Sequence, residues 1–134
     1  MNVKRYVLAS LAVFAFIFIF EWMFHGNLLS DFYAQSQHLW RAKEDVVMPA
    51  MFLGQFMFPF IFTFIFLKGY DNKGIGEGIR YGILIWLLFI PNNLIFYAVM
   101  PLSFTLVGLW ILGGLIEMVI AGAIAATIYR PKTA

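Results

Sequence analysis

Long apolar runs alternate with short polar stretches along the chain. The runs cover residues 6–24, 46–67, 79–100 and 104–129. Each run has about the 20 residues that a helix rising ~1.5 Å per residue needs to cross ~30 Å of hydrocarbon. The pattern therefore predicts an all-α protein in which four transmembrane helices form a single membrane domain over residues 1–134.

The phenylalanines of the first two runs follow a different period. Phenylalanine stands at every second position over residues 14–20 and 56–66, which is the period of a β-strand. The residues between them are mostly apolar as well, whereas a strand of a transmembrane barrel alternates apolar with polar positions over ~10 residues. We therefore expect helices in both runs.

The start of the chain raises a second alternative. Lys4 and Arg5 precede an apolar run, as in a secretory signal peptide. That run is longer than a typical signal core, however, and its end at residues 21–24 contains no small-residue cleavage site. We therefore expect the first span to be retained.

Composition agrees with a membrane location. Hydrophobic residues make up 63% of the chain, charged residues make up 12%, and the mean hydropathy is +0.86. So few charges cannot cover the surface of a water-soluble domain of this size. The chain has no cysteine, which excludes disulfides, thiolate metal sites and iron–sulfur clusters.

The basic residues indicate the orientation of the spans. Of the nine Lys and Arg residues, Arg41 and Lys43 alone fall between the first and second runs, among acidic residues. The others lie before the first run, around the connection from the second to the third, or after the fourth: Lys4, Arg5, Lys68, Lys73, Arg80, Arg130 and Lys132. By the positive-inside rule we expect both termini to be cytoplasmic, in a bacterial inner (cytoplasmic) membrane. The pI near 9.0 then reflects orientation and implies no nucleic-acid partner.

Each run also carries at least one strongly polar side chain. These side chains are Glu21, Gln55, Asn92, Asn93 and Glu117. Counted at ~1.5 Å per residue, each lies roughly 17 to 22 Å from the inner end of its span. Helix tilt accounts for differences of a few Å, so these side chains lie at nearly the same depth in the membrane. Because polar groups in hydrocarbon are unfavourable, they mark sites or assembly contacts. We therefore expect a polar layer inside the bundle.

Two neighbours extend this layer. His25 follows Glu21 by four residues, so their side chains share a helix face and can hydrogen-bond. Pro91 directly precedes Asn92, and a proline within a span frees a backbone carbonyl. The candidate proton or ion site is therefore Glu21, His25, Gln55, Asn92, Asn93 and Glu117.

The last run places small residues on the face of Glu117. They are Gly113, Gly114, Ala121, Gly122 and Ala125. Small side chains let another helix approach closely. We therefore expect Glu117 to face protein, with these five small residues at a helix–helix contact.

The connection between the first and second runs, residues 25–45, mixes apolar and polar residues. Its apolar members are Leu28, Leu29, Phe32, Leu39 and Trp40, and polar residues such as Asp31 and His38 lie between them. This pattern predicts an amphipathic segment at the outer surface. Such a segment either rests on the lipid interface, or docks a partner or gates a solute.

The sequence favours a non-catalytic accessory or assembly subunit. Little of the chain lies outside the predicted spans, the last span has a small-residue face, and no nucleophile stands near a base in a recognisable spacing. On this interpretation the protein is not an enzyme, and its helices associate in the lipid bilayer with other membrane proteins or with a second copy. The polar layer then holds the helices in register, through hydrogen bonds of about 1 kcal/mol each.

A small proton- or cation-coupled transporter is the alternative. If Glu21 and Glu117 approach each other in apolar surroundings, their like charges favour one proton shared between them. A carboxyl group that changes protonation in a cavity is the usual basis of proton coupling. One copy of four short helices leaves little room for a solute path, so this function favours a dimer.

Metal or haem binding is a further alternative, although no cofactor is predicted. Glu21, His25 and Glu117, with a neighbouring amide, offer oxygen and nitrogen ligands for a divalent ion. The diiron pattern of paired Glu-x-x-His motifs is not met, because the one close pair, Glu21 and His25, is four residues apart. His25 and His38 are the histidines available to a b-type haem.

Parts of the sequence resemble short bacterial four-helix membrane proteins. The resemblance rests on EWMFHGNLL at residues 21–29, on Tyr33, on LWR at residues 39–41, on GIRYG at residues 78–82, and on the small-residue last run. It covers most of the chain in topology. It implies four spans and carries over no activity, cofactor or site residue.

Overall fold

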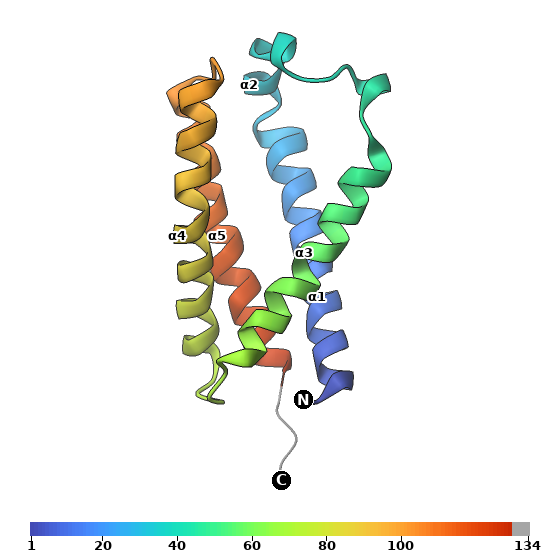
Figure 1. The fold of residues 1–134 in the computed structure, drawn as a ribbon, viewed down its shortest axis with the longest axis vertical. Helices are drawn as coiled ribbons and strands as arrows, with labels where there is room; N and C mark the ends of the chain where they lie inside the picture. The colour runs from blue at the N-terminus through green and yellow to red at the C-terminus, as the bar shows by residue number, and fades with distance from the viewer. Residues whose placement is uncertain (130–134) are drawn as a thin grey trace.

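The computed structural model describes residues 1–129 and is built from four long helices. They are α1 (Val3–Met23), α3 (Met48–Lys68), α4 (Ile75–Val99) and α5 (Phe104–Ile128) (Figure 1). A π-helical turn, Phe24–Leu28, extends α1, so that the first apolar helix runs over Val3–Leu28. All four helices are long and apolar enough to cross a membrane, which confirms the predicted all-α fold with four apolar helices.

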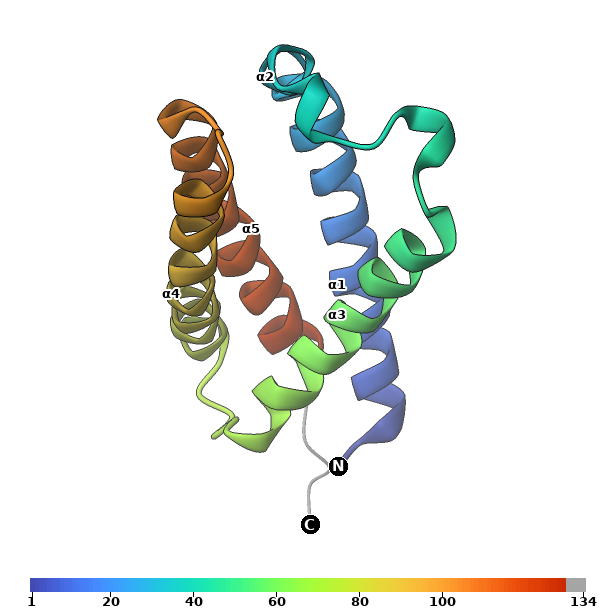
Figure 2. The same ribbon diagram turned by 45° about the horizontal axis from the view of Figure 1, so that its top comes forward.

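The helices meet at one end of the bundle and separate towards the other. α4 packs along α5, α1 contacts both α3 and α5, and α3 contacts α5 over a short length. Figures 1 and 2 show that α3 crosses the bundle obliquely, ends beside the start of α4, and lies away from α4 at the opposite end. We call the end with the N-terminus the base, and the end with the connection after α1 the rim. α3 and α4 therefore diverge from the base to the rim.

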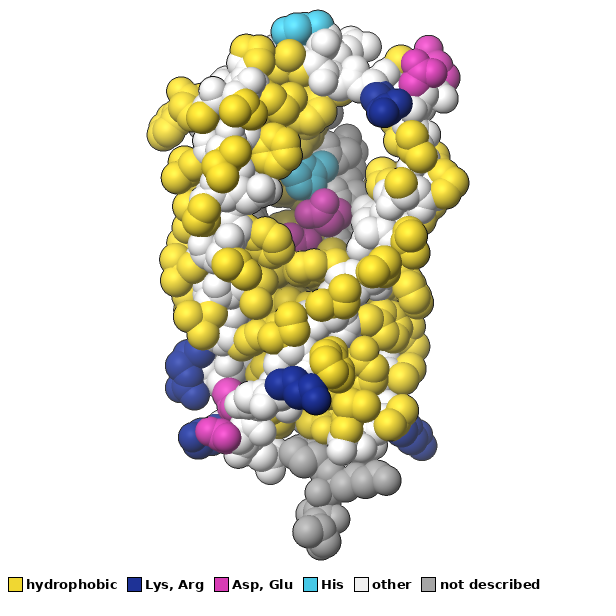
Figure 3. Space-filling view, viewed as in Figure 1, with side chains coloured by type: hydrophobic (Ala, Val, Ile, Leu, Met, Phe, Trp, Pro, Cys, Tyr) yellow, Lys and Arg dark blue, Asp and Glu magenta, His cyan; other side chains and the backbone are white. Residues whose placement is uncertain are grey.

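The outer surface of the helices is apolar. Figure 3 shows hydrophobic side chains along the length of the bundle, with most of the visible Lys and Arg side chains at the base and another at the rim beside acidic side chains. On α4, for example, Leu88 is 71% exposed and Val99 is 73% exposed. Such a surface is unfavourable in water and suits contact with lipid.

Glycines bring α4 and α5 into direct backbone contact. A Cβ atom at Gly78 would collide with the carbonyl of Gly122, and a Cβ atom at Gly82 would collide with the carbonyl of Met118. Such an approach maximises dispersion contacts, which are a main source of attraction between helices in lipid. Gly122 belongs to the packing face expected from the sequence, whereas the two glycines of α4 were not expected there.

Hydrogen bonds from aromatic side chains to backbone carbonyls also join the helices. Tyr81 of α4 donates its hydroxyl hydrogen to the carbonyl oxygen of Phe62 on α3 over 2.7 Å. The indole N–H of Trp86, also on α4, donates to a carbonyl oxygen of α5 over 2.7 Å. A helix carbonyl has a second lone pair that can accept such a bond. These contacts tie α4 to its neighbours without using the polar layer.

An apolar core fills the base of the bundle. Its buried members come from α1, α3 and α5: Val13, Ile17, Phe62, Phe66, Met118, Ala121, Ala125 and Ala126. The rings of Tyr70 and Tyr81 both contact the ring of Phe66 and cover this core. We call this cluster the base core.

A second, smaller core lies at the rim. Its buried members are Leu29, Leu102, Leu106 and Val107. The connection after α1 contains the short helix α2 (Ser30–Gln35) and the 3₁₀ turns Gln37–Leu39 and Lys43–Asp45. Its apolar residues Phe32 and Leu39 pack against the rim core, whereas Asp31 and His38 are exposed. Leu28 and Trp40 are exposed, so the apolar residues of this connection lie both against the rim core and on the surface.

The glycine contact predicts a difference between two Gly→Ala variants. Gly82→Ala should lower the free energy of unfolding by about 1 to 3 kcal/mol, because the new methyl group meets backbone atoms that cannot rotate away. Gly108→Ala is the matched control on α5, because open space surrounds its Cβ position. The control should leave stability unchanged or raise it by up to ~1 kcal/mol. Thermal unfolding in detergent measures both, and equal stabilities would contradict the close α4–α5 contact.

Candidate functional site

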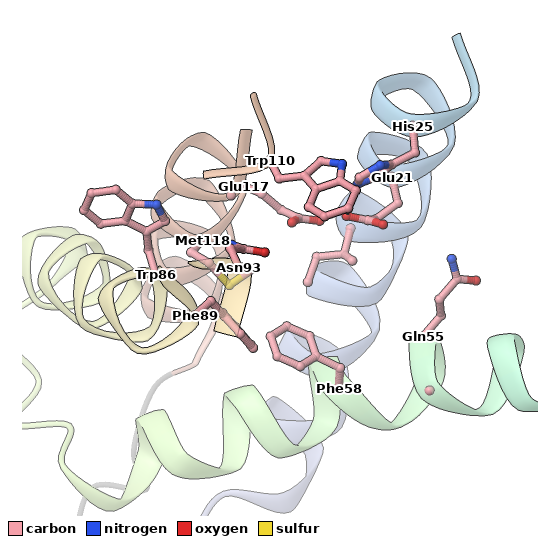
Figure 4. A pocket seen from close by; sticks show the side chains of 13 residues that line it. Glu21, His25, Gln55, Phe58, Trp86, Phe89, Asn93, Trp110, Glu117 and Met118 are labelled. Atoms are coloured by element: carbon pink, nitrogen blue, oxygen red, sulfur yellow. The ribbon is translucent and has the colours of Figure 1, made fainter. Parts of the chain in front are cut away.

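Two carboxyl groups meet between the base core and the rim core. Glu21, on the last turn of α1, and Glu117, in the middle of α5, point towards each other in Figure 4, close enough for their charges to interact. Glu117 is 7% exposed, and its Oε1 atom has no hydrogen-bond partner among the described residues. A buried acceptor without a donor is unfavourable by about 1 to 3 kcal/mol. The pair therefore favours the entry of a hydrogen-bond donor.

The carboxyl pair lines a cavity of about 360 Å³ to which all four long helices contribute. Its polar lining consists of Glu21, His25, Gln55, Asn93 and Glu117. Its aromatic lining consists of Phe58, Trp86, Phe89 and Trp110. A cavity of this size, with a few polar groups on apolar walls, is typical of small-molecule sites.

The cavity opens sideways, between α3 and α4. Figure 3 shows a hollow on this face of the bundle, with acidic and histidine side chains at its bottom. The side chains of Glu21 and His25 are 33% and 34% exposed, respectively. A second cavity, of about 470 Å³, lies between α1 and α3 and shares Glu21, His25 and Gln55 with the first. A solute can therefore reach the carboxyl pair without passing the base core.

A chain of polar contacts leads from the carboxyl pair to the rim. His25 Nε2 lies 3.5 Å from Glu21 Oε1, and His25 Nδ1 lies 2.5 Å from the hydroxyl oxygen of Tyr33. The indole N–H of Trp110 donates to the same hydroxyl oxygen over 2.8 Å. Because an indole can only donate, the hydroxyl hydrogen of Tyr33 is available to His25 Nδ1. A neutral His25 then carries its own hydrogen on Nε2, facing Glu21.

A π-helical turn positions His25 for these contacts. The backbone N–H of Leu29 donates to the carbonyl oxygen of Phe24, five residues earlier, over 2.9 Å. Such turns are rare and occur frequently at functional sites. After this turn the chain continues into α2, where the ring of Tyr33 lies 5.8 Å from the ring of His25.

Tyr33 keeps its proton at physiological pH. Burial of its side chain is the main cause that raises the pKa of Tyr33 to about 12. The charge of Glu21 acts in the same direction, whereas the hydrogen bond from Trp110 acts against it. Tyr33 is therefore a neutral donor to His25.

The structure brings together five of the six side chains proposed from the sequence as a polar layer. Glu21, His25, Gln55, Asn93 and Glu117 line one cavity, whereas Asn92 is exposed on another face of α4. Consecutive residues of a helix point about 100° apart, and at this position Asn93 faces the cavity while Asn92 is turned away from it.

The five small residues expected at a helix contact have different surroundings. Ala121, Gly122 and Ala125 are buried at the base, and Gly122 contacts α4. Gly113 lies under the ring of Phe24, and Gly114 lines the cavity. The small-residue face therefore serves two purposes. It allows close helix packing between Glu117 and the base, and it leaves space for the cavity on the rim side of Glu117.

Sequence reasoning missed the aromatic residues of the site. Trp110 lies in an apolar run, and Tyr33 lies in the connection after the first run, outside the predicted spans in which the polar layer was sought. Tyr and Trp carry a polar tip on an apolar body and pair with buried polar groups. The presence of such residues near the depth of the polar layer is the signal that could have found Trp110.

The residues suggested as metal or haem ligands do not form a ligand cluster. Within residues 1–129, no three His, Cys, Asp or Glu side chains gather closely enough to hold a metal ion. His25 pairs with Glu21 and Tyr33 instead, and His38 is exposed in the turn Gln37–Leu39.

Comparisons with protein-family models, with curated proteins and with solved structures find no match to this chain. The geometry of the cavity therefore carries the functional argument by itself.

The contact between Trp110 and Tyr33 predicts a loss of stability on removal of one hydroxyl group. Tyr33→Phe leaves the Trp110 N–H without its acceptor and should lower the free energy of unfolding by about 1 to 3 kcal/mol. Tyr97→Phe is the matched control, because Tyr97 lies on α4 with 41% of its surface exposed. Chemical unfolding in detergent compares the two, and an equal effect of both variants would refute the proposed contact.

Proposed function

We propose that the protein is a small membrane transporter that exchanges a proton for a cationic solute at the Glu21–Glu117 pair. The observation that carries this proposal is the unpaired Oε1 atom of Glu117, which is buried in a cavity beside a second carboxyl group. A carboxyl group buried in such a place is energetically unfavourable. Groups of this kind therefore mark a functional site or an assembly contact.

Charge repulsion explains why the pair would exchange one cation for another. Two ionised carboxyl groups in direct contact repel each other strongly where water is scarce, so Glu21 and Glu117 favour one shared proton. A solute with one positive charge can replace that proton without a change in the net charge of the site. Proton release and solute binding are then two sides of one equilibrium.

The proposed orientation places the base at the cytoplasmic side of a bacterial inner membrane. Lys4 and Arg5 begin α1, Lys68 ends α3, and Lys73 lies in the connection to α4, all at the base. Arg130 and Lys132 lie outside the described residues. With both termini inside, the cavity lies in the outer half of the membrane and the base core separates it from the cytoplasm.

A second candidate is the accessory or assembly subunit that the sequence favours. Its support is the sideways opening between α3 and α4, which a helix of another membrane protein could cover. Purification from the native membrane in mild detergent separates the candidates. A stoichiometric membrane-protein partner would support the accessory function, whereas a monomer or homodimer would refute it.

The orientation predicts which introduced cysteines an impermeant thiol reagent can reach. The natural chain has no cysteine, so each variant carries one reporter. In intact cells Lys43→Cys should be labelled, because residues 29–47 lie outside in this orientation, and Lys73→Cys should be labelled only after the membrane is opened. Labelling in the reverse order would contradict the orientation.

Proton exchange predicts a pH change in proteoliposomes when guanidinium is added outside. Guanidinium keeps its charge at neutral pH, so it cannot cross as a neutral base. The pH inside, followed with a trapped dye, should rise because each entering cation is exchanged for a leaving proton. Glu117→Gln should abolish this rise, because it removes a carboxyl group of the pair.

Glu44→Gln is the matched control for this assay, because it removes an exposed carboxyl group in the turn Lys43–Asp45. It should leave the exchange rate unchanged. If the pH inside rises no faster with the unaltered protein than in empty liposomes, the proposed transport function is wrong. If Glu117→Gln exchanges as fast as the unaltered protein, the carboxyl pair is not the site.

A further inference from the structure

Two residues that line the cavity each have a buried oxygen atom that is an acceptor without a donor. Oε1 of Glu117 and Oε1 of Gln55 have no hydrogen-bond partner among the described residues. They come from different helices, α5 and α3, and both residues line the same cavity. A group bound between them must supply hydrogen-bond donors. A neighbouring carboxylate strengthens the bond when the donor is positively charged.

The rest of the cavity wall suits an apolar body. The rings of Phe58 and Phe89 lie 5.9 Å apart, and Figure 4 shows Trp110 beside the two carboxyl groups. Aromatic faces attract cations and also remove apolar surface from water. A small inorganic cation would leave this wall without a contact, whereas an organic cation would use it.

The sideways opening indicates how such a molecule is placed. Phe89 lines the cavity from α4 and is 40% exposed, so this wall of the cavity reaches the apolar outer surface of the bundle. An apolar tail can therefore stay among the lipid chains while the charged group lies between the helices. The charged group then meets the carboxyl pair at the bottom of the hollow in Figure 3.

We propose that the solute is an amphipathic protonated amine, whose N–H groups donate to Glu117 and Gln55 and whose apolar body lies against the aromatic wall. This inference rests on the proton-exchange function above and narrows its solute class. A quaternary ammonium has the same charge but no N–H donor, so it leaves both acceptors unpaired. The site therefore discriminates by donors as well as by charge.

Binding of three probes to the purified protein tests this inference. Tryptophan fluorescence reports binding, because Trp86 and Trp110 line the cavity. Phenethylammonium should bind at least about tenfold more tightly than phenethyltrimethylammonium, which lacks the donors. The affinity for phenethylammonium should also exceed the affinity for methylammonium, which lacks the apolar body, by a similar factor.

Two variants test whether Gln55 distinguishes phenethylammonium from the trimethyl probe. Gln55→Leu should weaken the binding of phenethylammonium about tenfold, because one acceptor is lost, and should leave the trimethyl probe unchanged. Asn92→Leu is the matched control, because Asn92 is exposed on α4 outside the cavity. It should change the binding of neither probe.

The outcomes separate this inference from the proposed function. Equal affinities for the two phenethyl probes, an equal effect of Gln55→Leu on both, or no binding of any probe would overturn the amine assignment, even if guanidinium still exchanges for protons. Selective binding of phenethylammonium without proton release would support the amine site and refute proton exchange.

Discussion

The contact between Glu21 and Glu117 is the constraint on which the rest of the structure depends. Each carboxyl group belongs to a helix of otherwise apolar residues, where one buried negative charge is already unfavourable. A second charge beside it adds repulsion that little water screens. A proton or a cation at the pair offsets this repulsion, so the occupancy of the pair and the stability of the fold are linked.

The surrounding helices hold the pair in place and leave it accessible. Gly78, Gly82 and Gly122 keep α4 against α5, and the base core fills the space between α1, α3 and α5. Near the rim, α3 leaves α4, and the side chain of Glu21 stays 33% exposed. A rigid base with an open side keeps the two carboxyl groups together and lets a solute reach them.

Hydropathy and helix geometry predicted much of this arrangement. The four spans follow from run length, and depth counting brought Glu21, Gln55 and Glu117 together because the rise of a helix is nearly constant. Depth says nothing about rotation, which is why counting did not distinguish Asn92, which lies outside the cavity, from Asn93, which lines it. The rotation of α4 is set by the glycine contact with α5, and the place of Tyr33 is set by packing at the rim. Both depend on partners distant in the sequence.

The most direct test of the central claim is the infrared spectrum of the carboxyl groups in purified protein, recorded as pH is varied across neutrality. We expect a protonated carboxyl band at neutral pH that is lost in Glu117→Gln and kept in Glu44→Gln, because the shared proton belongs to the buried pair. The absence of such a band in the unaltered protein, or its persistence in Glu117→Gln, would contradict the account.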